Sequence, residues 1–154
     1  MGSGQAGHRP RKRFGQNFLT DRHVIDRIMQ AIDARPEDTI AEIGPGHGAL
    51  TEIRSGARLH VVELDRDLVA RWRLREGERL SVHAADALDF DFRALAPPGG
   101  ALRVVGNLPY NISTPLLFRL LGAVASVADQ HFMLQKEVVD RMAAAPGSKD
   151  YGRL

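Results

Sequence analysis

The spacing of hydrophobic residues changes along the chain in a regular way. A stretch that begins at Thr20 and Asp21 has apolar residues at helical spacing, and Arg35 and Pro36 end it. After it, short apolar blocks alternate with amphipathic stretches. The apolar blocks predict strands over residues 39–43, 59–64, 80–84, 102–105 and 132–135. The amphipathic stretches predict helices over residues 49–55, 68–76, 114–121 and 137–145.

Strands that alternate with helices indicate an α/β protein with a parallel sheet covered by helices on both faces. Thr114 is the expected cap of the helix over 114–121, with Pro115 as its first helical residue. The strand over 132–135 is the last one in the sequence, and its outer edge would be unpaired in an open sheet. We therefore expect the domain to be incomplete at its C-terminal end.

Composition narrows the class of protein. The 154 residues are enough for one domain and too few for two of ordinary size. Cysteine is absent, which excludes disulfides, cysteine-ligated zinc and thiol nucleophiles. No apolar run approaches the roughly 20 residues of a membrane-spanning helix, and residues 1–10 lack the apolar core of a signal peptide. We expect a cytoplasmic monomer that uses no metal ion and contacts no membrane.

Positive charge is concentrated near the N-terminus. Residues 1–35 hold seven Arg or Lys and three Asp, whereas residues 36–154 hold fourteen basic and sixteen acidic residues. The run from His8 to Arg13 supplies most of this excess. A flexible basic arm over residues 1–12 on a nearly neutral body suggests a polyanionic partner, and a merely solvated tail is the alternative.

A glycine-rich loop follows the first predicted strand. Gly44, Gly46 and Gly48 lie between that strand and a helix, an arrangement that lets backbone approach a ligand and directs free N–H groups at it. The spacing differs from the GxGxxG pattern of dinucleotide sites, and Pro45 removes one N–H that a pyrophosphate could use. The loop therefore favours a nucleoside without phosphates, such as S-adenosylmethionine, over NAD.

Carboxylates follow the next two predicted strands. Either Glu63 or Asp65 can accept hydrogen bonds from both hydroxyls of a ribose, and Glu63 lies nearer the strand tip. NAD enzymes use the same acceptor, so it does not separate the two cofactors. Asp86 can accept a hydrogen bond from the exocyclic amine of the cofactor's adenine. Because ligands of open α/β sheets bind at the carboxyl ends of the strands, we expect these residues to line one crevice.

The segment over residues 106–111 follows the fourth predicted strand and carries the residues expected to act on a substrate. The N6 amine of adenine is a poor nucleophile because its lone pair is delocalised into the ring. The Asn107 amide oxygen and the Leu108 carbonyl can accept hydrogen bonds from both N6 hydrogens and localise this lone pair. Pro109 biases Leu108 toward an extended backbone, and Tyr110 offers a face on which an extruded base can stack.

Together these motifs resemble those of the ribosomal RNA adenine N6,N6-dimethyltransferase family, and most closely its bacterial small-subunit members. The likeness covers essentially the whole chain after the basic arm. It rests on six ordered motifs: RFGQNFL at 13–19, EIGPG at 42–46, VELD at 62–65, DA at 86–87, NLPYNIS at 107–113 and FMLQKEVV at 132–139.

The resemblance implies a Rossmann-like class I S-adenosylmethionine-dependent methyltransferase sheet over residues 13–154. It also implies that the last strands of the family and its small helical C-terminal domain are missing. The implied cofactor contacts are Asn17, Leu19, Gly44, Glu63, Asp86 and Asn107, and the implied methyl-transfer site is Asn107, Leu108 and Tyr110. The implied reaction is N6,N6-dimethylation of two adjacent adenines in the 3′-terminal hairpin loop of 16S rRNA in the immature 30S subunit.

Two other interpretations stay open. The short chain is compatible with a non-catalytic fragment that assists ribosome assembly or only binds the cofactor. Adenine of large-subunit rRNA or of DNA is another candidate target. Leu108 favours RNA over DNA, because DNA enzymes similar to this family more often have proline at that position.

Overall fold

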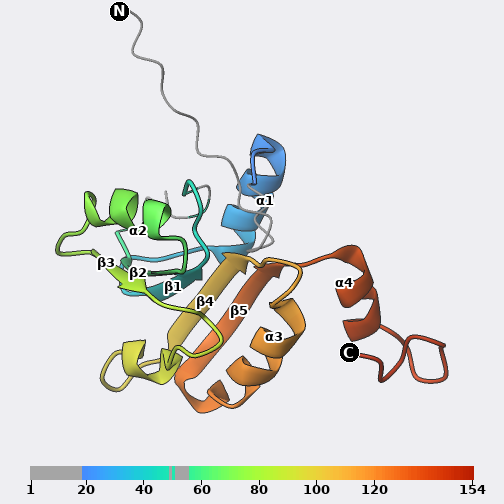
Figure 1. The fold of residues 1–154 in the computed structure, drawn as a ribbon. Helices are drawn as coiled ribbons and strands as arrows, with labels where there is room; N and C mark the ends of the chain where they lie inside the picture. The colour runs from blue at the N-terminus through green and yellow to red at the C-terminus, as the bar shows by residue number, and fades with distance from the viewer. Residues whose placement is uncertain (1–18, 49, 51–55) are drawn as a thin grey trace, which may run out of the picture.

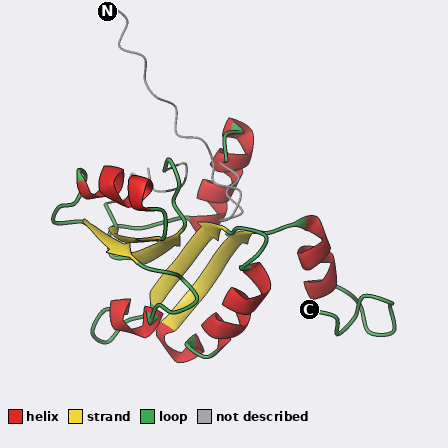
Figure 2. Cartoon of the chain, viewed as in Figure 1, coloured by secondary structure: helices red, strands yellow, loops and turns green. Residues whose placement is uncertain are grey.

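The computed structural model describes residues 19–48, 50 and 56–154, and within them the strands form a five-stranded parallel sheet (Figures 1 and 2). The strand order is β3-β2-β1-β4-β5, so the chain reverses its direction across the sheet after β3. The strands are β1 (Thr39–Ile43), β2 (Arg58–Glu63), β3 (Leu80–Ala84), β4 (Leu102–Asn107) and β5 (Val127–Met133). The predicted α/β fold with a parallel sheet is confirmed.

The helices are α1 (Arg22–Ile32), α2 (Arg66–Arg73), α3 (Ser113–Leu121) and α4 (Lys136–Met142), joined by the 3-10 helices η2 (Phe92–Leu95) and η3 (Val124–Ser126). Of the α-helices in residues 19–48 and 56–154, the longest is α1, with 11 residues. In the described part of the chain, no helix is long and apolar enough to cross a bilayer.

Helices cover both faces of the sheet, with α1 and α2 on one face and α3 on the other (Figure 1). Neighbouring residues of a strand point to opposite faces, so each strand supplies both layers. On the first face Ile40 packs with Ile32 of α1, and Val61 packs with Leu68 and Trp72 of α2. The opposite layer joins three strands to α3 and η2 through Ala41, Ile43, Val62, Val104, Phe92, Leu116 and Leu120.

The strand predictions were accurate where hydrophobicity alone defines the strand. The bounds of β1 and β3 match the prediction, and β2 lies one residue earlier than the predicted 59–64. However, β4 continues to Asn107, and β5 runs from Val127 to Met133 rather than over 132–135. Backbone pairing explains the differences in β4 and β5, because the two strands pair from Leu102 and Val127 to Asn107 and Met133, with one register shift between Leu102 and Arg103. The polar residues in β5 hide this strand from a hydrophobicity pattern.

The start of α3 differs from the prediction. The helix begins at Ser113, with Ile112 as a cap that makes no side-chain hydrogen bond, so Thr114 is not the cap. The Ser113 hydroxyl donates to the Tyr110 carbonyl (3.3 Å), and this turn winds into the helix one residue earlier. Pro115 is therefore the third helical residue and not the first as predicted, but it still lies in the first turn, where an N–H has no helical acceptor.

The other helices are shifted by a few residues from their predicted ranges. The predicted helix over 68–76 is α2, which begins at Arg66, and the predicted helix over 137–145 is α4, which ends at Met142. The predicted helix over 49–55 lies outside the described residues apart from Leu50.

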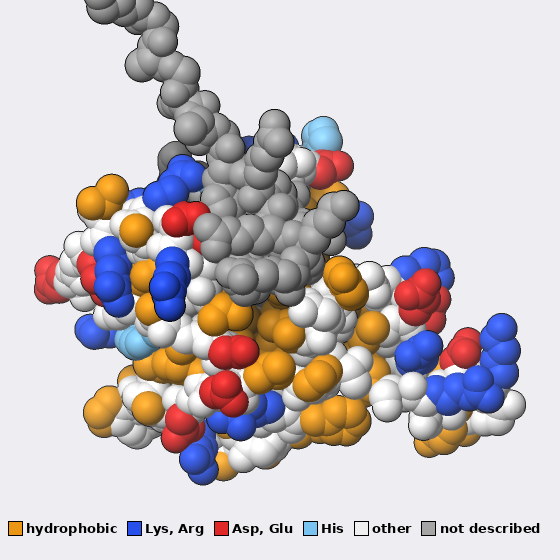
Figure 3. All heavy atoms as spheres, in the orientation of Figure 1, with side chains coloured by type: hydrophobic (Ala, Val, Ile, Leu, Met, Phe, Trp, Pro, Cys, Tyr) orange, Lys and Arg blue, Asp and Glu red, His pale blue; other side chains and the backbone are white. Residues whose placement is uncertain are grey.

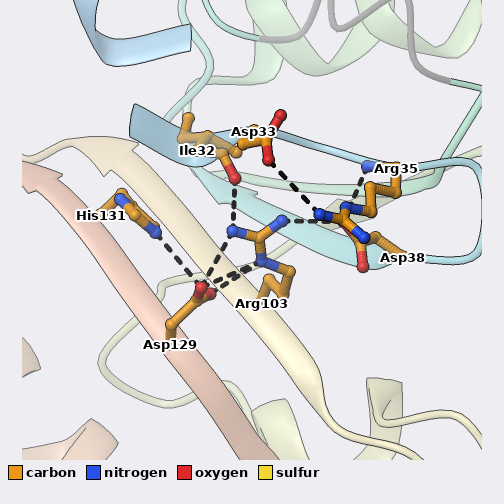
Figure 4. Close-up of polar contacts among 7 residues, drawn as sticks. All are labelled: Ile32, Asp33, Arg35, Asp38, Arg103, Asp129 and His131. Carbon is orange, nitrogen blue, oxygen red and sulfur yellow. Dashed lines mark hydrogen bonds and ion pairs between the residues drawn. The ribbon is translucent and has the colours of Figure 1, made fainter. Parts of the chain in front are cut away.

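A polar cluster around Arg103 joins α1 to the sheet at the end opposite the carboxyl ends of the strands (Figure 4). The guanidinium donates to Asp38 (2.7 Å), to Asp129 on β5 (2.9 Å) and to the carbonyl of Ile32, the last residue of α1. Asp129 also contacts His131 at 3.3 Å. Burial alone would raise the pKa of Asp129, but the hydrogen bonds from Arg103 and His131 lower it overall.

Candidate active site

A cavity of about 590 Å³ opens at the carboxyl ends of the strands, where the loops after all five strands meet. This position, next to the point where the strand order reverses, is where open α/β sheets bind ligands. The volume lies within the range typical of small-molecule sites. Six residues singled out from the sequence line this cavity: Gly44, Glu63, Asp86, Asn107, Leu108 and Tyr110.

The glycine loop leaves space for a ligand but offers it few N–H groups. Each glycine N–H is used within the protein: Gly44 donates to the Val62 carbonyl (2.9 Å), Gly46 to the Glu63 carboxylate (3.4 Å) and Gly48 to the Pro45 carbonyl (2.8 Å). The expectation of free N–H groups in this loop is therefore wrong for these three residues. Gly44 has a φ of +60°, and a Cβ built there would meet nothing within 4 Å. The loop thus favours close approach by a ligand over phosphate binding.

Trp72 of α2 packs against this glycine loop. The sequence motifs did not indicate this contact. Its Nε1–H donates to the Gly46 carbonyl (3.0 Å). A Cβ on Gly48, which has a φ of +96°, would lie 2.7 Å from the indole ring, so only glycine fits there. The signal in the sequence was weak because Trp72 lies 26 residues from Gly46 and looks like an ordinary core residue of an amphipathic helix.

Of the two candidate ribose acceptors, Glu63 lines the cavity and Asp65 serves a different purpose. The Asp65 carboxylate caps α2 by accepting hydrogen bonds from the N–H groups of Asp67 (2.9 Å) and Leu68 (3.4 Å). Glu63 Oε1 accepts from the N–H groups of Leu64 and Asp65, both at 3.0 Å. Among the described residues, its Oε2 has only the long contact to Gly46, so it keeps acceptor capacity toward the cavity.

The Glu63 carboxylate is buried, with the residue 6% exposed. Burial raises its pKa, although the backbone hydrogen bonds from Asp65, Gly46 and Leu64 act in the opposite direction. A partly desolvated carboxylate with one under-used oxygen is well suited to accept hydrogen bonds from neutral hydroxyl donors of a ligand.

Asp86 forms the wall of the cavity beyond β3. Its Oδ1 accepts the N–H of Leu88 (2.9 Å), which fixes the carboxylate at the start of the turn. Within the described residues, no hydrogen bond is found at its other oxygen, Oδ2. That oxygen can accept a hydrogen bond from an amine in the cavity.

The loop after β4 brings an amide, a fixed backbone segment and an aromatic ring to the cavity. Asn107 is the last residue of β4, and the N–H of Leu108 extends the ladder by donating to the Met133 carbonyl (3.1 Å). This hydrogen bond and the buried Leu108 side chain hold the segment in place. Tyr110 is 54% exposed at the cavity wall, so its ring face is accessible to a second ligand.

The remaining predicted contacts lie at the N-terminal side. Asn17 lies outside the described residues, as does the basic arm over 1–12. Leu19 is half-buried and is not among the described residues that line the cavity. Conversely, the wall at the end of β5 is formed in part by Met133, Leu134 and Gln135, which belong to a recognised motif but had no predicted role.

A parallel sheet of this order, with acidic acceptors after β2 and β3 and an amide-bearing loop after β4, defines a class I methyltransferase-type α/β domain. A family model described as ribosomal RNA adenine dimethylase matches residues 7–154. The chain belongs to this ribosomal RNA adenine dimethylase family.

Known proteins agree with this membership. A relative from Cupriavidus metallidurans, named ribosomal RNA small subunit methyltransferase A, is 63% identical over 150 residues, which are 96% of this chain and 54% of the relative. A crystal structure of a dimethyladenosine transferase from Plasmodium falciparum matches with a TM-score of 0.75 and 28% identity, over 90% of this chain and 50% of that one. The 23S rRNA methyltransferase ErmE matches with a TM-score of 0.68 and 29% identity, over 81% and 50%. The chain thus spans about half the length of the curated relatives it matches.

Proposed function

We propose that this chain binds S-adenosylmethionine in the 590 Å³ cavity and methylates the N6 amine of adenine in ribosomal RNA. The observation that carries the proposal is the convergence of Glu63, Asp86 and Asn107 on one cavity beside an exposed aromatic ring. Family membership and the names of the relatives support it.

The residues of the cavity fit this cofactor. Glu63 Oε2 would accept from the ribose hydroxyls, and Asp86 Oδ2 would accept from the adenine amine. Gly44, with open space where a Cβ would stand, would let the donor pass close to the backbone. When bound, the cofactor supplies a methyl group on a positively charged sulfur, a good leaving group that needs no metal ion.

The chain itself would prepare the target amine. The Asn107 side-chain oxygen and the Leu108 carbonyl would accept the two N6 hydrogens of the target adenine and localise the nitrogen lone pair. With the amine held in this way, the N6–C bond would form as the C–S bond of the donor breaks and the sulfur takes the bonding electrons, and the acidified N6 would lose its proton to solvent. Because one hydrogen then remains on N6, the step can occur a second time. Tyr110 would hold the extruded base by stacking, which contributes about 1–3 kcal/mol.

The specific substrate we propose is a pair of adjacent adenines in the 3′-terminal hairpin loop of 16S rRNA, in the immature 30S subunit of the cytoplasm. Loop bases cost little to extrude, which suits a site that must surround N6. The name of the Cupriavidus metallidurans relative favours the small-subunit target over a large-subunit one.

Substitution of Asn107 tests the chemistry. In Asn107→Ala the acceptor for N6 is lost, so methyl incorporation into unmethylated 30S particles should fall at least about 100-fold, as for other lost transition-state hydrogen bonds. The affinity for S-adenosylmethionine, measured by calorimetry, should fall much less. Full methylation by the variant, or wild-type chain that binds no S-adenosylmethionine, would show the proposal to be wrong. A chain extended at the C-terminus, assayed in parallel, separates a non-catalytic fragment from an active one.

A further inference from the structure

A second hollow lies beside the cavity, on the other side of Leu64. It encloses about 320 Å³ and is lined by Leu64, Arg66, Val69, Ala70, Arg73 and Ala84. Leu64 also lines the 590 Å³ cavity, as does Ala85, the neighbour of Ala84. The two sites therefore share a wall. We name this hollow the α2 groove.

The α2 groove presents two arginines whose charges have no partner in the described part of the chain. The guanidinium groups of Arg66 and Arg73 form no hydrogen bond or ion pair there. The other arginines near α2 are engaged: Arg71 with His47 (3.2 Å), Arg75 over the ring of Trp72 (4.9 Å) and Arg79 with the Gly56 carbonyl (2.8 Å). Figure 3 shows Lys and Arg side chains gathered over α2, at the left of the view.

The spacing of Arg66 and Arg73 suits an extended polyanion. Seven residues are two helical turns, so the two side chains share one side of α2, about 10 Å apart along its axis. The surface between them is apolar, and Leu64 there is 47% exposed. Guanidinium groups bind phosphates with two hydrogen bonds each, and an apolar floor accommodates a base or a sugar.

We propose that the α2 groove binds a single-stranded segment of the RNA substrate, outside the target adenine, with Arg66 and Arg73 each contacting a phosphate. This inference rests on the proposed function, because it takes RNA to be the molecule methylated in the adjoining cavity. An acidic peptide offers carboxylates but no bases for the apolar floor, so RNA matches the groove better.

The test compares RNA binding by the 154-residue wild type and by a double variant, Arg66→Gln with Arg73→Gln. The probe is a synthetic RNA hairpin with two adjacent loop adenines and a single-stranded flank, titrated at several salt concentrations without methyl donor. The variant should bind about tenfold more weakly at low salt. The slope of log affinity against log salt should decrease by about 1.4, since each contact to single-stranded phosphate contributes about 0.7.

Matched variants separate this local effect from net charge and from folding. Arg93→Gln with Arg119→Gln removes the same charge from the opposite face of the sheet and should leave the salt slope unchanged. Arg66→Lys with Arg73→Lys keeps the charge and should keep the slope while losing part of the affinity. Thermal unfolding should be nearly the same in all four proteins, because all four substituted arginines are exposed.

Two results would overturn the inference. One is an unchanged RNA affinity and salt slope in the Gln double variant. The other is binding of polyglutamate by the wild type as tightly as RNA, with both lost in the variant, which would assign the groove to an acidic protein. The affinity for S-adenosylmethionine is measured separately and should be equal in wild type and variant. A wild type that does not bind S-adenosylmethionine would refute the proposed function. If only the inference about the α2 groove is wrong, binding of S-adenosylmethionine stays intact.

Discussion

Glu63 shows most clearly what a single residue contributes to the site. The VELD segment contains two carboxylates, Glu63 and Asp65, and their positions in the sequence alone do not establish which one faces a ligand. The structure separates them through backbone direction: Asp65 turns back to cap α2, and Glu63 remains at the cavity wall. Asp86 and Asn107 could be placed from the sequence because each directly follows or ends a strand. Trp72 could not, because its contact with Gly46 depends on how α2 lies against the loop.

The raised pKa of Glu63 makes donor binding sensitive to acid. Protonation turns one acceptor oxygen of the carboxylate into an O–H donor, so affinity for S-adenosylmethionine should fall as the pH is lowered from neutral toward this raised pKa. Glu63→Gln should bind about tenfold more weakly, because a hydrogen bond to a charged group contributes about 1.5 kcal/mol or more. It should also lose most of this pH dependence. Calorimetric titrations over this pH range measure both effects.

Glu37→Gln is the control for this experiment, because Glu37 is exposed before β1, at the opposite end of the sheet. Its donor affinity and pH profile should match those of the wild type. An affinity for S-adenosylmethionine that is independent of pH, or a Glu63→Gln variant that binds like wild type, would contradict the role of Glu63 as ribose acceptor.

At the level of elements, β5 and α3 mark the limit of what the sequence reveals. Strands β1 and β3 were predicted to the residue because their apolar blocks are bounded by turn residues. In β5, Asp129 and His131 interrupt the apolar pattern, because Asp129 binds Arg103 and His131 contacts Asp129. The start of α3 involves a hydrogen bond from the Ser113 hydroxyl to the Tyr110 carbonyl. The sequence favoured Thr114 and Pro115 instead, because a threonine followed by a proline is the more usual pattern for a helix start.

The Arg103 cluster should contribute strongly to how α1 is held on the sheet. The Arg103 side chain is 14% exposed, and its removal in Arg103→Met leaves Asp38 and Asp129 without their shared cation. Removing one partner of a mostly buried ion pair leaves the other charge desolvated and uncompensated, which is unfavourable in the folded state. The free energy of unfolding should therefore fall by about 3 kcal/mol. Urea denaturation followed by circular dichroism measures this change.

Arg93→Met serves as the comparison, because the ion pair of Arg93 with Asp91 is exposed on both sides. Its urea midpoint should stay close to that of the wild type. Equal midpoints for the Arg93 and Arg103 variants would mean that the cluster around Arg103 adds no net stability.

For the whole molecule, a pair of histidines ties stability to pH. His60 Nδ1 and His83 Nε2 lie 3.0 Å apart on neighbouring strands, and His60 is 7% exposed. Burial, with the nearby His83 and Arg58, lowers the pKa of His60 from 6.5 to about 4, and burial also lowers the pKa of His83. Between pH 6.5 and about 4, His60 binds a proton in the unfolded chain but not in the folded chain. The folded state therefore loses stability as the pH falls through this range.

The free energy of unfolding should therefore be highest above about pH 6.5 and should decrease toward pH 4, with no further loss from His60 below that value. His60 alone accounts for up to about 3 kcal/mol over this range. The variant His60→Phe removes this titration and should show a flatter profile in urea denaturation at successive pH values. A wild-type profile as flat as that of the variant would show that the histidine pair does not couple protonation to folding.

The packing of Trp72 against the glycine loop gives the molecule its own optical probe. Trp72 is the single tryptophan of the chain, and its indole touches the glycine loop, whose residues Gly44 and Gly46 line the cavity. Indole emission depends on the groups around the ring, so intrinsic fluorescence from one defined place reports occupancy of the cavity. Ligand binding can thus be followed in the unmodified chain without a label or a radioactive donor.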